Sequence, residues 1–73
     1  MNKEQRKQIK KALEHLEKAQ DILQEVGIDE QTAFDHLPES LQKTNKQLEN
    51  NAYVLETAVD DIVSITENID TLL

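Results

Sequence analysis

Two histidines, His15 and His36, are the strongest candidates for proton-transfer chemistry in this sequence. A histidine that works as a general base needs a nucleophile or a second acid held beside it. Ser40 and Ser64 are the serines that such a base could activate, but neither follows a recognisable nucleophile elbow or stands beside a base. The sequence therefore predicts no catalytic site, and we expect a protein that is not an enzyme.

Metal chemistry is also not expected. Di-iron sites in helical bundles use Glu-x-x-His pairs, whereas Ala12 and Ala33 stand three residues before the two histidines. Cysteine is absent, which removes thiolate zinc sites. Asp60 and Asp61 are adjacent, so on a helix their side chains diverge by about 100° and cannot share one buried ion. The interpretation is that no metal and no other cofactor is bound.

The clearest pattern is a heptad repeat in the C-terminal half. One repeat position is occupied by Leu41, Leu48, Leu55, Ile62 and Ile69. The position four residues later is occupied by Asn45, Ala52, Val59, Thr66 and Leu73. This alternation keeps an apolar seam on one side of a helix. Because no Gly interrupts it, the pattern predicts a long helix over residues 38–72. The polar Asn45 and Thr66 interrupt the seam and are expected to fix the register of packing. The alternative for Asn45 is a position near the connector where the seam faces solvent.

A first helix is predicted over residues 3–26. Its apolar face is formed by Ile9, Ala12, Leu13, Leu16, Ala19, Leu23 and Val26. Gly27 stands where a left-handed residue commonly ends a helix, so we expect the helix to stop there. The predicted order thus begins with one charged, amphipathic helix.

A short connector helix is predicted over residues 29–36, with Asp29 as its N-cap. Pro38 disfavours helical geometry in the residue before it, so a break is expected there. Phe34 and Leu37 are expected to plug the open end of a bundle. The alternative for Phe34 is an exposed docking side chain.

The predicted fold class is all-α: an antiparallel helical hairpin with a short connecting helix, assembled into a homo-oligomeric bundle. The C-terminal helix would reach about 50 Å and the first helix only about 35 Å, so one end would overhang. The apolar face also widens toward this end, which favours self-association, most simply as a dimer. The expected interface comprises Leu55, Ala58, Val59, Ile62, Val63, Ile65, Ile69 and Leu72.

Charge separates the two halves of the chain, whose net charge is −7. Lysine and arginine gather at the start of the first helix, and an acidic patch is predicted at Asp60, Asp61, Glu67 and Asp70. An antiparallel hairpin brings these opposite charges together, which selects orientation more than it stabilises. No apolar run approaches about 18 residues, so we expect no membrane contact and a cytoplasmic location.

Direct nucleic-acid binding is not expected, because the chain is acidic and has no helix-turn-helix, zinc finger or aromatic stacking platform. Two kinds of protein partner remain. The first is another copy of the chain in a non-catalytic interaction or assembly protein. The second is a host nucleic-acid-processing protein, whose basic groove an acidic helical rod would block by charge mimicry.

Residues 29–42 read Asp-Glu-Gln-Thr-Ala-Phe-Asp-His-Leu-Pro-Glu-Ser-Leu-Gln. This run resembles a stretch of small acidic proteins of Gram-positive phages and prophages, which follows the pattern E-Q-x-A-[FY]-D-x-L-P-E-S-L-Q. Such proteins usually carry a glycine-containing segment shortly afterwards. Residues 43–47 here contain no glycine, which favours a more continuous long helix. The resemblance implies a phage or prophage origin, with host-factor inhibition or virion assembly as roles, and it transfers no functional residues.

Overall fold

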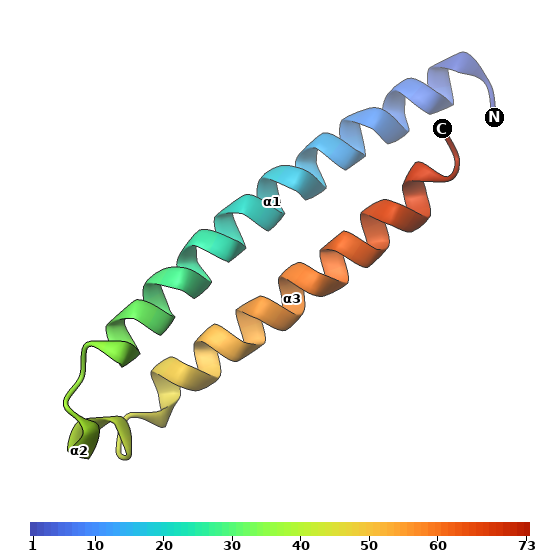
Figure 1. The fold of residues 1–73 in the computed structure, drawn as a ribbon. Coiled ribbons are helices and arrows are strands. Elements are labelled where there is room, and N and C mark those ends of the chain that lie inside the picture. The colour runs from blue at the N-terminus through green and yellow to red at the C-terminus, as the bar shows by residue number, and fades with distance from the viewer.

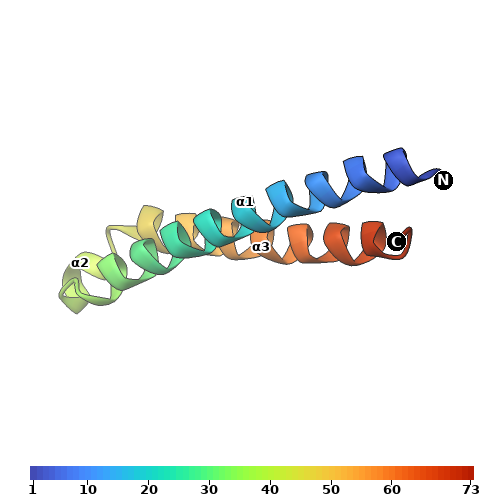
Figure 2. The ribbon, with the colours of Figure 1, turned by 90° about the horizontal axis from the view of Figure 1, so that it is seen from above.

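The computed structural model describes residues 1–73 as an all-helical rod (Figure 1). Helix α1 spans Lys3–Asp35, the single turn α2 spans Glu39–Gln42, and α3 spans Lys46–Asp70. Helices α1 and α3 run antiparallel and pack against each other, with both termini at one end of the rod and α2 at the other (Figures 1 and 2). The rod measures 58 × 15 × 11 Å. It is therefore two helices wide and one helix thick.

Helix α1 continues through the predicted stop at Gly27. The prediction of a first helix over 3–26 and a separate connector helix over 29–36 is wrong, because both belong to one helix of 33 residues. Gly27 does not adopt a positive φ, so it is an interior helical residue rather than a C-cap. The reason is visible in the spacing: the alternation of four and three residues passes through Gly27 and ends at Phe34.

The start of α1 is closed by a capping box. The Asn2 side-chain Oδ1 accepts a hydrogen bond from the backbone N–H of Gln5 at 2.7 Å, and the Gln5 Oε1 accepts one from the backbone N–H of Asn2 at 3.1 Å. Each bond satisfies a backbone donor that has no partner within the helix. The helix is therefore stabilised from its first turn.

The predicted long helix over 38–72 is wrong at its start. Pro38 precedes only the short α2, and α3 begins at Lys46. Between them, the Thr44 hydroxyl and the Asn45 side-chain amide both donate to the carbonyl of Leu41, at 3.1 and 2.8 Å. Such side-chain bonds compete with helical backbone bonds and end the turn even though no glycine is present. The connector of the structure is therefore residues 36–45, and Asn45 lies exposed in it and not in the packed seam.

The connector is held against the end of α1. The side-chain amide of Gln42 donates to the carbonyls of Leu37 at 3.1 Å and Phe34 at 3.3 Å. Phe34 is 8% exposed and Leu37 is half-buried. The reversal between the helices is therefore a packed and hydrogen-bonded turn.

The order of helix lengths is the reverse of the predicted one. Helix α1 has 33 residues and α3 has 25. The predicted overhang of the C-terminal helix, from which self-association was expected, is therefore wrong, because seven of the residues assigned to that helix form α2 and the turn after it. The exposed apolar side chains that a partner could cover lie along the sides of the rod.

Gly27 defines the register of the two helices. A Cβ atom placed on Gly27 would lie 3.3 Å from the Cβ of Leu55, so the helices approach closely there. Counting from this contact by alternating steps of four and three defines the seam of α1 as Ile9, Leu13, Leu16, Gln20, Leu23, Gly27, Glu30 and Phe34. The seam of α3 is Leu48, Ala52, Leu55, Val59, Ile62, Thr66 and Ile69.

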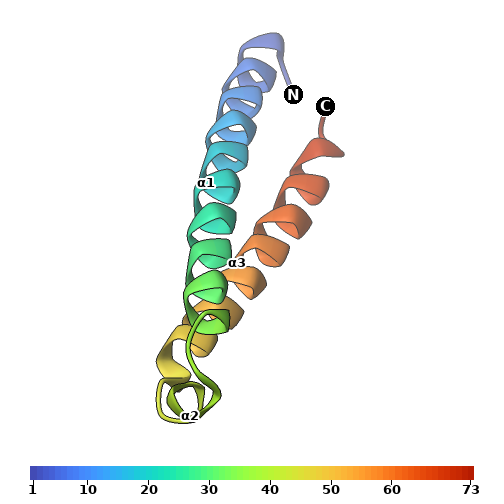
Figure 3. The same ribbon diagram turned by 60° about the vertical axis from the view of Figure 1, so that its left-hand side comes forward.

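This seam forms a shallow core. Only Phe34 and Ala52 are buried, and the other seam residues are half-buried because no third helix covers them. The hydroxyl of Thr66 donates to the carbonyl of Val63 at 2.8 Å within α3, so its hydrogen-bonding need is met without a partner in α1. The helices cross at a shallow angle along the seam (Figure 3).

Candidate interaction surface

The two histidines do not form a site. His15 is exposed on α1, and His36 follows the end of the same helix, 21 residues later. At 1.5 Å per residue they are about 30 Å apart. The Nδ1 of His36 donates a hydrogen bond to the carbonyl of Thr32 at 2.7 Å, so this ring satisfies a backbone acceptor at the C-terminus of α1. Ser40 and Ser64 are both exposed and lie on α2 and α3.

No group of three or more His, Cys, Asp or Glu side chains is arranged to hold a metal ion. Neither long helix has an apolar stretch sufficient to cross a bilayer. The two broad sides of the rod differ in chemistry.

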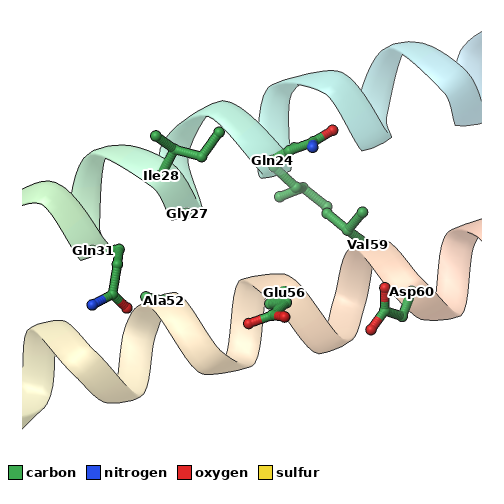
Figure 4. A pocket seen from close by; sticks show the side chains of 9 residues that line it. Gln24, Gly27, Ile28, Gln31, Ala52, Glu56, Val59 and Asp60 are labelled. Atoms are coloured by element: carbon green, nitrogen blue, oxygen red, sulfur yellow. The ribbon is translucent and has the colours of Figure 1, made fainter.

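One broad side carries a depression of about 400 Å³ beside Gly27 (Figure 4). It exists because a residue without a side chain occupies the seam. Its polar lining comes from Gln24 and Gln31 of α1 and from Glu56 and Asp60 of α3. It is open, and no histidine or serine reaches it, so it offers carboxylates and amides without a partner for catalysis.

The lining of this depression identifies which side chains share a side of the rod. Gln24, Ile28 and Gln31 each follow a seam residue of α1 by one position, and Glu56 and Asp60 do the same on α3. Residues one position after the seam on both helices therefore lie on this side. Residues one position before the seam lie on the opposite side.

We call the first side the acidic face, because carboxylates dominate it. Between the levels of Ile9 and Phe34, Lys10 is its single basic residue. Its nine carboxylates are Glu14, Glu17, Asp21, Asp35, Glu49, Glu56, Asp60, Glu67 and Asp70.

We call the opposite side the apolar face. Its apolar residues are Ala12, Ala19, Ile22, Val26 and Ala33 of the first helix, with Val54, Ala58, Ile65 and Leu72. The large ones are open to solvent: Val26 is 43% exposed, Ile65 is 45% exposed and Ile22 is 57% exposed. Its charged side chains, Asp29 and Asp61, lie on its outer edges. Each precedes a seam residue, Glu30 or Ile62, that is tilted away from the centre of the apolar face.

The structure divides the predicted oligomer interface among three environments. Leu55, Val59, Ile62 and Ile69 belong to the seam and pack toward α1. Ala58, Ile65 and Leu72 lie on the apolar face. Val63 lies on the acidic face.

The predicted acidic patch divides as well, because Asp60, Glu67 and Asp70 lie on the acidic face and Asp61 lies on the other. The predicted interface lay on the C-terminal helix alone, so it omitted Val54 and every residue, including Ile22 and Ala33, by which α1 contributes to the apolar face. The signal for Ala33 was present as a seven-residue spacing from Val26, but it was hidden by the expected helix end at Gly27.

Comparisons of this chain with protein-family models, with curated proteins and with solved structures find no match.

Proposed function

We propose that this chain is a non-catalytic helical interaction protein that docks through its apolar face. The observation that carries the proposal is a set of exposed apolar side chains on one side of the rod, Ile22, Val26, Val54 and Ile65, in a chain that buries only two residues. A small domain without disulfides or a metal commonly needs association to be stable.

The energy available at this face is large on the scale of the fold. Complete burial of one Val, Leu or Ile side chain contributes about 1.5–3 kcal/mol. Covering several half-exposed side chains thus adds several kcal/mol, before the cost of association, to a domain stability that is typically about 5–15 kcal/mol.

A position-specific photo-crosslinker tests this proposal. Benzoyl-phenylalanine replaces Ile65 on the apolar face in one variant and Ile28 on the acidic face in the control, since both are exposed isoleucines. Both variants are irradiated in a Gram-positive host cell. We expect a covalent protein adduct from position 65 and little from position 28. No adduct from position 65, or equal adducts from both, contradicts docking through the apolar face.

The acidic face favours a second candidate function, inhibition of a host nucleic-acid-processing protein by charge mimicry. Its nine carboxylates face one way along the rod, and a basic nucleic-acid groove recognises such an array. A phage or prophage origin, which the resemblance of residues 29–42 implies, fits this role and also fits an assembly role.

Adjacent aspartates on opposite faces provide the test of mimicry. The immobilised chain should retain nucleic-acid-binding host proteins at low salt and release them at about 0.5 M salt, where exposed charges are screened. Asp60→Asn should reduce retention more than Asp61→Asn. Retention that ignores salt, or equal effects of both substitutions, argues against mimicry.

A further inference from the structure

We propose that the apolar face is covered by a second copy of this chain, forming a four-helix bundle with both connectors at the same end. The inference rests on the proposed function and names the partner that the face receives. In this arrangement a two-fold axis runs parallel to the helices, so α1 of each copy lies over α3 of the other.

The area of the rod supports such a partner. The chain exposes 5715 Å², whereas a compact monomer of 8.4 kDa exposes about 4600 Å². The excess of about 1100 Å² exceeds the roughly 800 Å² that each partner buries in a standard interface. A side of 58 × 15 Å, on the order of 900 Å², is large enough to bury that area.

Charge specifies which sides can meet in a self-associated pair. Two acidic faces brought together would oppose eighteen carboxylates, whereas the centre of the apolar face carries no charged side chain. Packing the apolar faces together separates the acidic faces by two helix layers, roughly 20 Å, which exceeds the Debye length of about 8 Å at physiological salt. Like charges are therefore kept apart.

Side-chain sizes specify the orientation. At the level of Ala19 in α1 lies Ile65 in α3, and at the level of Val26 lies Ala58, by the register that Gly27 defines. With α1 over α3 of the second copy, each of these levels sets a small side chain opposite a large one. Packed interiors favour such alternation because it fills space evenly. The basic start of α1 then also lies beside the acidic end of the second copy's α3.

Sedimentation equilibrium of the full chain tests the association. From about 1 to 100 µM, a range that resolves micromolar Kd values, we expect the mass to approach twice 8.4 kDa. Val26→Lys on the apolar face should weaken association at least about 100-fold, because each dimer loses two buried valines. Ile28→Lys, two residues away on the acidic face, should leave association unchanged. A monomer throughout the range, or equal effects of both substitutions, overturns the proposal.

Circular dichroism shows whether Val26→Lys stays helical, and Ile65→Ser serves as a second, milder variant if it does not. If the chain is monomeric and position 65 crosslinks to a different protein, the dimer proposed here is wrong and the proposed docking function still holds. The absence of any adduct from position 65 removes the proposed function itself.

Electron–electron distances test the orientation. The chain has no cysteine, so Lys43→Cys in the connector creates a single spin-label site. Connectors at the same end place the two labels about 10–30 Å apart, from the 8–10 Å spacing of packed helices and the reach of the labels. A distance near the 58 Å length of the rod places the connectors at opposite ends and overturns the proposed orientation.

Discussion

Replacing Gly27 tests the contact on which the register of the hairpin depends. As an interior residue of α1 without a positive φ, Gly27 costs about 1 kcal/mol of helix stability relative to alanine. The new Cβ of Gly27→Ala would lie 3.3 Å from the Cβ of Leu55, so the helices must separate by a few tenths of an ångström. Because no third helix lies behind either of them within the chain, we expect this movement to cost less than the propensity gain.

The expected net effect of Gly27→Ala is a stabilisation of about 0.5–1 kcal/mol, or a rise in Tm of about 2–8 °C. Gly27→Leu introduces an equally good helix former, but its branched side chain must enter the space that Leu55 occupies. Overpacking of this kind costs about 1–3 kcal/mol, so we expect a net loss. The difference between the two variants isolates the contact with α3 from the helix propensity.

Urea and thermal unfolding followed by circular dichroism at one fixed protein concentration measure both changes. The double variant Gly27→Leu with Leu55→Ala again pairs a large side chain with a small one, and it should recover at least half of the loss. Two results would refute the reasoning. Destabilisation by Gly27→Ala of about 1 kcal/mol would indicate a left-handed helix end, and stabilisation by Gly27→Leu would show that Leu55 does not lie opposite.

Two further substitutions test the ends of the rod. Phe34→Ala should lower the free energy of unfolding by about 3 kcal/mol, because Phe34 is 8% exposed between the connector and α3. Tyr53→Ala is the control: Tyr53 is 67% exposed, so its loss should change the stability by less than about 0.5 kcal/mol. Equal losses in urea unfolding would contradict the packed turn. Asn2→Ala removes the capping box, so it should lower the stability by about 1 kcal/mol and speed amide exchange in the first turn of α1. Asn50→Ala is the control, because Asn50 is exposed in the interior of α3 and its replacement should be neutral or slightly stabilising. Unchanged amide exchange in Asn2→Ala would show that the cap contributes nothing.

Local spacing determined the helical class of this protein and the seam of α3. The heptad positions from Leu48 to Ile69 were readable because seven-residue spacing is a property of one helix alone. The break at Pro38 was readable for the same reason, since the ring acts on the residue before it. The same spacing extends through α1 to Phe34, although Gly27 by its residue type alone indicates a helix end.

Other features depended on both helices together. Gly27 is a seam residue because Leu55 lies opposite, and only the packed pair distinguishes this role from a helix end. Likewise, the sequence predicts that the side chains of Asp60 and Asp61 diverge, but only the packed pair places one with the carboxylates of α1 and the other with its apolar residues. The seam of each helix indicates its inward direction, but which side of α1 lies next to which side of α3 depends on how the two helices pack. The division of the rod into an acidic and an apolar face was therefore decided by tertiary packing.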